Sequence, residues 1–427
     1  MTGWRGRRGH RPVRTAAAVM MMATGVGLLI GLCFGVQARA DEPSSGWMPE
    51  HAEIFGRVEI EGTGFFEGAA FPEQVDQGAS IAIEATALAE WNDGDTVFTL
   101  TPFARIDAQD DARSHFDLRD FKIEHVQGDW AVTFGVDREF WGRTEVVHLV
   151  DIVNQTDAVE DLDDEDRLGQ PLLKVSRLFD LGEVSLYYFP YVRVRTLPGP
   201  EGRLRLPVPF NTNTEIFETS AEEWTPSFAA RYVGVFGAVD VGLSAFHGVS
   251  RDPSFLLQAG RLVPVYSRIT QLGLDAQYTS GATLWKGEAI FREGQRNAAF
   301  EQEIFGAFTG GFEHTLFQVA DTDADLGLIL EGAYDSRGDD ALTVFDNDVI
   351  VGARLTLNDT QDTALLLTSA IDVKTAATTL RLEAERRLSQ NMTAGLEAQG
   401  FINSDDDFFE AGLADDSFVR LKLNIFF

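Results

Sequence analysis

Charged side chains recur at every second position in several segments of this sequence, with apolar side chains at the positions between them. Alternate residues of an extended strand point to opposite faces, so the charges of each segment share one face. Both signs occur, which fits cross-strand ion pairing along a wet wall. It also fits a ladder that selects and guides a charged solute, because rings of charged side chains set the selectivity of pores. The candidate residues on this face are Arg57, Glu59, Lys122, Glu124, Lys286, Glu288, Arg292, Arg354, Arg381, Glu383, Arg420 and Lys422.

A second concentration of carboxylates lies in residues 137–170, a long segment that shows no alternation. If this segment folded into a pore, its carboxylates would form a constriction that favours cations. If it stayed outside, it would be an exposed acidic loop or one bridged to anionic lipid through divalent cations. The constriction candidates are Asp151, Asp157, Glu160 and Asp161.

Residue types that perform catalysis are present but not arranged in motifs. The histidines after residue 40 sit singly, and neither G-x-S-x-G nor H-E-x-x-H occurs. The segment Asp321–Asp325 starts like a calcium loop, but Leu326 and Gly332 replace the glycine and glutamate that such a loop needs. We therefore predict no enzymatic activity, no metal site and no cofactor.

The alternating segments read as antiparallel strands, and the connections between them tend to go long, short, long, short. In one segment Leu380 and Leu382 oppose Arg381 and Glu383. The phase slips near Asp120, as a β-bulge would cause. Long connections are expected at 137–170 and 193–223, and a shorter loop at 250–260. The sequence predicts an all-β fold, an antiparallel barrel of about 18 strands with roughly 16 to 20 plausible.

The last segment, Ser417–Phe427, alternates most regularly: Val419, Leu421 and Leu423 oppose charged neighbours, and the chain ends on Phe427. It resembles the closing strand of bacterial outer-membrane β-barrels, whose terminal phenylalanine is the signal read by the barrel-assembly machinery. The resemblance implies a transmembrane barrel in contact with outer-membrane lipids and lipopolysaccharide, and allows a homo-oligomer.

The amino-terminal 40 residues have the pattern of a signal peptide. A basic region is followed by an uncharged apolar stretch, Ala16–Val36, and by Ala38-Arg39-Ala40 before Asp41. An uncleaved membrane anchor is the alternative. We expect cleavage near Ala40, a Gram-negative outer-membrane location, and a barrel domain over 41–427. The single cysteine, Cys33, lies within the leader, so thiol chemistry is not expected.

The composition excludes one class of partner. A formal net charge of −32 at pH 7 argues against nucleic acid, whose binding requires neutralisation of phosphates by Lys and Arg. The 44% hydrophobic content and 32 Phe argue against a disordered acidic chain.

The segment Phe140–Leu173 resembles a family of functionally uncharacterised, porin-like outer-membrane proteins of proteobacteria. The shared features are Trp141-Gly142 and an Asp-x-x-Asn-x-x-Asp stretch from Asp151 to Asp157; Gln155 stands where the family usually has proline. The resemblance implies porin-like architecture. General porins place their constriction loop after the fifth strand, which makes 137–170 the candidate for a loop folded into the lumen.

These observations together favour an outer-membrane channel for diffusion of small hydrophilic or charged solutes, whose identity the sequence leaves unknown. Three alternatives stay open. They are an exporter of a polysaccharide-like polymer, which should have a lumen of one sign; an outer-membrane hydrolase; and a surface-binding barrel blocked by its loops.

Overall fold

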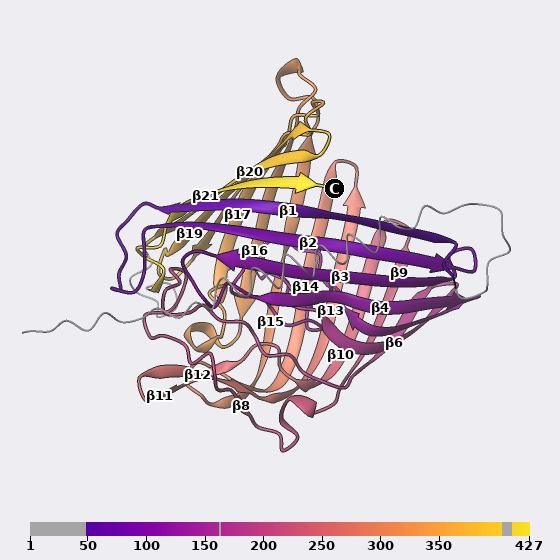
Figure 1. Cartoon of the computed structure of the whole chain (residues 1–427), viewed down its shortest axis with the longest axis horizontal. Coiled ribbons are helices and arrows are strands. Elements are labelled where there is room, and N and C mark those ends of the chain that lie inside the picture. Colours follow the sequence, from indigo (N-terminus) through magenta and orange to yellow (C-terminus); the bar gives the residue numbers. More distant parts are fainter. Residues whose placement is uncertain (1–47, 162–163, 404–411) are drawn as a thin grey trace, which may run out of the picture. The chain divides into compact units, whose positions relative to one another are not determined.

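The computed structural model describes residues 48–161, 164–403 and 412–427. The predicted signal peptide and its cleavage site lie outside the described residues. Residues from His51 onward form one compact unit, built on a closed sheet of 18 antiparallel strands (Figure 1). Each strand pairs with its neighbours in the chain, and β21 pairs back with β1. The predicted all-β barrel and its strand number are therefore confirmed.

The barrel strands are β1 (His51–Phe65), β2 (Gln77–Trp91), β3 (Thr96–Asp107), β4 (Phe116–Gln127), β5 (Trp130–Asp137), β6 (Gln170–Phe179), β7 (Gly182–Phe189), β9 (Ser227–Phe236), β10 (Val239–Val249), β13 (Arg268–Ser280), β14 (Thr283–Arg296), β15 (Gln302–Leu316), β16 (Asp325–Asp335), β17 (Asn347–Thr356), β18 (Ala364–Asp372), β19 (Thr378–Ser389), β20 (Met392–Ile402) and β21 (Phe418–Phe426). Short 3-10 helices are η1 (Glu222–Trp224), η2 (Val319–Asp321) and η3 (Gly338–Asp340). Among the described residues, no helix has the length and apolar character to span a membrane.

Closure of the barrel involves the carboxy-terminal residue itself. The backbone N–H of Phe427 donates to the carbonyl of Gly56, and the N–H of Gly56 donates to the carbonyl of Phe427, both at 3.0 Å. The ladder continues through pairs such as Ile60 with Leu423. A closed sheet leaves no unpaired edge, which is a requirement for strands in lipid.

Burial along the strands is the inverse of that in a water-soluble sheet. On β13, Leu272 is 56% exposed whereas Asp275 is fully buried. On β14, Trp285 and Phe291 are exposed whereas Glu288 is buried. The alternating sequence thus puts apolar side chains outside and polar ones inside, the pattern of a barrel whose outer surface contacts lipid.

The connections differ at the two ends of the barrel. One end has short turns, such as 92–95, where the central residues Asp93 and Gly94 have φ of 57° and 90°, the positive values that a type I′ turn requires. The other end carries long connections, including 138–169, 190–226 and 250–267. The pairing of β3 with β4 shifts between Thr101 and Pro102 opposite Arg119, which confirms the predicted bulge near Asp120.

The expected simple loop at 250–260 is wrong. This region holds β11 (Ser254–Gln258), which forms a hairpin with β12 (Arg261–Tyr266) outside the barrel sheet. The parallel strand β8 (Ile216–Phe217) completes this small sheet (Figure 1). Because β12 is buried along most of its length and touches no lipid, it lacks the alternation that identifies barrel strands.

Candidate functional site

The connection 138–169, termed the inner loop below, crosses the interior of the barrel. Arg143 Nε of the loop lies 3.2 Å from Asp275 of β13. Asp161 of the same loop lies 2.5 Å from Arg420 of β21. These two strands stand on nearly opposite sides of the ring, so a segment that contacts both must pass through the lumen.

Apolar side chains hold the middle of the inner loop against one wall. Val150 and Val153 are fully buried and belong to a core cluster with wall residues of β7, β10, β13, β14 and β15. Trp141 is 2% exposed, packs 5.5 Å from Tyr187, and carries the guanidinium of Arg231 4.8 Å from its ring. Such packing contributes about 2 kcal/mol for each large side chain, so the loop is an ordered part of the interior.

A single wall carboxylate organises the first arm of the loop, residues 143–150. Glu288 Oε1 accepts hydrogen bonds from the backbone N–H of Arg143 at 2.6 Å, the N–H of Thr144 at 3.2 Å and the hydroxyl of Thr144 at 2.9 Å. Its Oε2 accepts one from the N–H of Val150 at 3.2 Å. A Cβ at Gly142 would lie 3.3 Å from this carboxylate and 2.8 Å from the Phe140 ring, so a larger residue would require these side chains to shift.

A second wall carboxylate extends this arrangement. Glu331 accepts the backbone N–H of Glu145 with both oxygens, at 3.1 Å each. The Glu145 side chain in turn lies 3.1 Å from Lys286 and 2.5 Å from Arg354. Burial alone would raise the pKa of Glu145, but the charges of Lys286 and Arg354 hold it below its usual value. The Glu145 carboxylate is therefore ionised and paired with both cations.

The second arm, residues 157–161, meets the opposite wall through its own carboxylates. Asp157 lies 2.7 Å from Arg119 and 3.1 Å from His115; Glu160 lies 2.7 Å from Arg105. Burial would raise the pKa of Asp157, but the hydrogen bond from His115 and the charge of Arg119 lower it to about 2. Each carboxylate here is thus held by a wall cation.

Between the arms, polar side chains fix the path of the chain. The amide of Asn154 donates to the carbonyls of Asp137 and Leu168, both at 2.8 Å, and so joins the two ends of the loop. Gln155 is fully buried, and its amide donates to the carbonyl of Arg193. Asp151 lies 3.0 Å from Arg167, yet burial raises its pKa to about 6.

The predicted wall residues occupy the barrel strands as expected, and most are paired. All of them except Glu124 and Glu288 have an ion-pair partner within 4.0 Å. Arg57 is the loosest, 4.0 Å from Glu84. Glu124 accepts a hydrogen bond from Thr133. Their predicted role as pore-lining residues, and the cation preference predicted for Asp151, Asp157, Glu160 and Asp161, remain predictions.

The sequence reading missed several partners of these residues. Arg105 and Arg119 are wall residues that hold the second arm, and Arg119 was obscured because it is the bulged residue. Arg105 lies on the inward-facing set of alternate positions of β3, so the alternation of the sequence could have identified it as a wall residue. Asp252 and Glu145 lie in loops, where no periodicity marks them.

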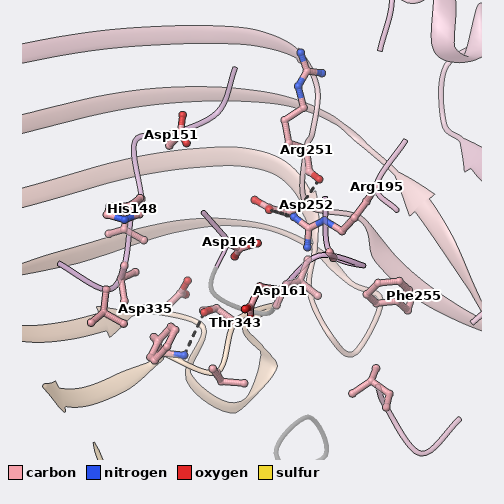
Figure 2. A pocket seen from close by; sticks show the side chains of 18 of the residues that line it. His148, Asp151, Asp161, Asp164, Arg195, Arg251, Asp252, Phe255, Asp335 and Thr343 are labelled. Carbon is pink, nitrogen blue, oxygen red and sulfur yellow. Dashed lines mark hydrogen bonds and ion pairs between the residues drawn. The ribbon is translucent and has the colours of Figure 1, made fainter. Parts of the chain in front are cut away.

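Two cavities lie beside the inner loop. One of about 200 Å³ is lined by charged wall residues, including Arg57, Glu84 and Lys422. The other, termed the outer cavity, measures about 360 Å³ and is lined by the inner loop, by the 190–226, 250–267 and 336–346 connections, and by strands. Figure 2 shows Arg195 and Asp252 facing each other in it, with Phe255 on one side and His148 on the other.

Within residues 48–161, 164–403 and 412–427, two groups of side chains have ligand atoms within 4.8 Å of one another, close enough to hold a metal ion. His115, Asp157 and Glu160 form the first group, which arginines already neutralise. Asp346, Asp348 and Asp372 form the second, at the long-loop end, and Lys374 Nζ lies 3.5 Å from Asp346.

Comparison with known proteins supports the fold. No protein-family model and no curated protein matches the chain in sequence, so the resemblance around Phe140–Leu173 stays a prediction. Among solved structures, the chain is similar to Wzi, an Escherichia coli outer-membrane protein described as a carbohydrate-binding β-barrel involved in group 1 capsule assembly. The TM-score is 0.50 at 12% identity, covering 86% of this chain and 84% of that one. Mutants of the Rh. blastica porin also match, with a TM-score of 0.42 at 10% identity for one of them, over 88% of this chain and 100% of that one. The chain has the fold of outer-membrane β-barrels.

Proposed function

We propose that the protein is a selective outer-membrane channel, through which small charged solutes diffuse past the inner loop. The observation that carries the proposal is a closed barrel with an apolar outer surface and a charged interior that one ordered loop narrows. By analogy with bacterial barrels, the long connections face outward and the short turns face the periplasm.

The proposal includes a location and partners. The chain is delivered to the outer membrane after cleavage near Ala40, and Phe427, paired with Gly56, is the residue that the assembly machinery reads. Outer-membrane lipids and lipopolysaccharide surround the barrel, which is compatible with a homo-oligomer.

In this proposal the ion pairs between the inner loop and its arginine partners set how strongly the channel prefers cations. Asp151, Asp157, Glu160 and Asp161 all have arginine partners, which reduces the field that they offer to a passing cation. The mixed signs along the wall argue against export of a polymer, for which a lumen of one sign is expected.

A surface-binding barrel is the second candidate, and the crossing of the lumen by the inner loop favours it. The similarity to Wzi, which is described as carbohydrate-binding, makes a sugar one candidate ligand for the outer cavity.

Single-channel recording in planar bilayers tests the first candidate. The native protein should show a small conductance, with a reversal potential under a salt gradient that reports its preference for one ion sign. A variant with residues 139–168 replaced by a short Gly/Ser linker should show a conductance several times larger. If neither protein conducts, although both are folded and inserted, the channel proposal is wrong.

A further inference from the structure

Three aspartates, termed the aspartate triad below, converge at the long-loop end of β17 and β18. Asp346 directly precedes β17 and Asp348 is the second residue of that strand, so both side chains lie on the same face of the chain. Asp372, the last residue of β18, pairs directly with Asp348 in the register of the sheet. One oxygen of each aspartate lies within 4.8 Å of the other two. Like charges directly opposite each other on neighbouring strands are destabilising, so this arrangement needs a compensating charge.

Asp348 differs from the other buried carboxylates in residues 48–161, 164–403 and 412–427. Each of the others has a cation within 4.0 Å or accepts at least two hydrogen bonds. Asp348 is 5% exposed and accepts one hydrogen bond, at 3.2 Å from the backbone N–H of Asn347. The ammonium of Lys374 lies within 4.0 Å of Asp346 and Asp339 but not of Asp348. A buried carboxylate without a counter-charge is unfavourable, so Asp348 is suited to a cation from solution.

The two other members of the aspartate triad are held beside Asp348. Asp372 Oδ1 accepts hydrogen bonds from the backbone N–H groups of Lys374 and Thr375 and from the Thr375 hydroxyl, which fixes the orientation of its carboxylate. Asp346 Oδ2 is buried and accepts no hydrogen bond. Lys374 Nζ lies 3.5 Å from this oxygen, but its side chain is 48% exposed and also pairs with Asp339 at 2.9 Å. One half-exposed ammonium therefore faces three carboxylates.

The other group with suitable ligand atoms shows what a compensated cluster looks like in this protein. In the group of His115, Asp157 and Glu160, Arg119 lies 2.7 Å from Asp157, and Arg105 lies 2.7 Å from Glu160. Both arginines are almost fully buried with the carboxylates that they pair with. The protein thus supplies the counter-charge itself in that group and leaves the aspartate triad short of it.

We propose that Asp346, Asp348 and Asp372 bind a hard divalent cation such as Ca²⁺. Carboxylate oxygens without nitrogen or sulfur ligands are the donors that Ca²⁺ and Mg²⁺ prefer. The bound cation neutralises the triad and links the 336–346 connection, part of which lines the outer cavity, to the end of β18. This site goes beyond the proposed channel function, and its test does not depend on conductance.

Isothermal titration of Ca²⁺ into the full chain, purified in detergent and treated with EDTA, tests the site. The titration is run near neutral pH in about 0.15 M NaCl, which screens the general acidity of the surface. We expect one Ca²⁺ per chain with a Kd of about 0.1 to 1 mM, the range of extracellular calcium modules. Absence of a saturable Ca²⁺ site in this range would overturn the proposal.

Two variants form a matched pair for this titration. Asp348→Asn removes one ligand charge and should weaken Ca²⁺ binding at least about tenfold. Asp340→Asn removes the same charge from an exposed residue of the 336–346 connection outside the triad, and should leave binding unchanged. Equal Ca²⁺ affinity in the native protein, Asp348→Asn and Asp346→Asn would refute the site.

Lys374→Gln separates a cation site from a permanent ion pair. If Lys374 only competes with the bound cation, its loss should tighten Ca²⁺ binding about threefold or more, because a nearby positive charge is removed. If Lys374 is instead the lasting counter-charge of the triad, Lys374→Gln should bind Ca²⁺ no more tightly than the native protein. That second result would contradict the proposal.

Thermal unfolding provides a readout that a merely structural role of Asp348 would not reproduce. In EDTA the native protein carries a buried carboxylate without a counter-charge, so Asp348→Asn should unfold at the same temperature or a higher one. With Ca²⁺ at about 100 times the Kd, the unfolding temperature should rise by several degrees for the native protein and not for Asp348→Asn. An Asp348→Asn protein that is less stable in EDTA and equally stabilised by Ca²⁺ would show that Asp348 binds no cation.

Discussion

The two arms of the inner loop differ in which partner supplies the charge. In the first arm, wall carboxylates Glu288 and Glu331 accept hydrogen bonds mainly from the loop backbone. Only Glu145 of this arm adds a carboxylate that wall cations bind, Lys286 and Arg354. In the second arm, wall arginines bind the loop's own carboxylates, such as Asp161 with Arg420. Contacts to the backbone tolerate changes of loop sequence, whereas contacts to side chains do not. The first arm is therefore suited to fix the path of the loop, and the second to tune its charge.

The largest effect is expected from Glu288→Ala. It leaves the N–H groups of Arg143, Thr144 and Val150 buried without an acceptor, at a cost of about 3 to 6 kcal/mol. The first arm should leave the wall, which would raise single-channel conductance and expose the loop to trypsin.

Glu293→Ala is the matched control for Glu288→Ala, because Glu293 lies on the same strand with an exposed side chain. Glu288→Gln should give a conductance and a trypsin sensitivity between those of the two variants, because one of its two terminal acceptor atoms becomes a donor. An unchanged conductance and unchanged trypsin resistance in Glu288→Ala would show that apolar packing alone holds the first arm.

The second arm should respond to Arg420→Gln. Arg420 is 4% exposed and lies 2.5 Å from Asp161 and 3.1 Å from Glu397, so its loss removes a cation from two buried carboxylates. Glu397 keeps Lys422 at 3.0 Å, so Asp161 is expected to lose more. We expect a loss of about 3 kcal/mol in the free energy of unfolding, measured by denaturant titration.

A double-mutant cycle separates the pair from its surroundings. Combining Arg420→Gln with Asp161→Asn should recover part of the lost stability, because the loop carboxylate is then neutral. The exposed pair Arg387 and Asp362, both more than half exposed, should give a coupling of at most about 1 kcal/mol. Equal coupling for the two pairs would contradict a charge-held second arm.

Acid and neutral pH should act differently on Asp151, between the two arms, and on Asp157, in the second arm. Burial raises the folded pKa of Asp151 from 3.8 to about 6, so the stability linked to this group is fully present below about pH 4 and is lost as the pH rises through 6. The pKa of Asp157 is lowered to about 2, so its contribution is present above 3.8 and is lost as the pH falls through 2.

Unfolding measured across pH 2 to 7 checks these signs. Asp151→Asn should remove the decline between pH 4 and 6, amounting to about 1 to 2 kcal/mol, and leave the decline at acid pH in place. Asp157→Asn should remove the decline at acid pH and leave the decline between pH 4 and 6 in place. The same profile for both variants would mean that the two carboxyls titrate as one group.

The wall was predictable from sequence because a two-residue period is imposed on every strand by lipid on one side. Leu380 against Arg381, or Leu421 against Arg420, reveals its face without knowledge of the partner strand. The closure and an approximate strand number follow from repeating that pattern, since a barrel has no edge.

The candidate site was only half predictable. The sequence marked the inner loop by its acids, but acids alone do not reveal that arginines from β3, β4 and β21 neutralise them. Those contacts join segments 55 residues apart for Arg105 and Glu160, and 259 apart for Arg420 and Asp161. Loop residues such as Asp252 lack a period. Glu288 was predicted as a wall residue, yet its binding of loop N–H groups has no sequence signal, because any loop backbone offers the same donors.

The smallest effect, and the sharpest test of the comparison between the arms, is expected from Thr144→Val. The Thr144 hydroxyl donates to Glu288 Oε1 at 2.9 Å and lies 2.5 Å from the carbonyl of Val147, and valine keeps its shape while removing these bonds. If backbone donors hold the first arm, Glu288 retains three of them and the loss should be about 1 kcal/mol, with conductance nearly unchanged. If Thr144→Val instead approached Glu288→Ala in conductance and trypsin sensitivity, the first arm would depend on a side chain just as the second does, and the contrast between them would disappear.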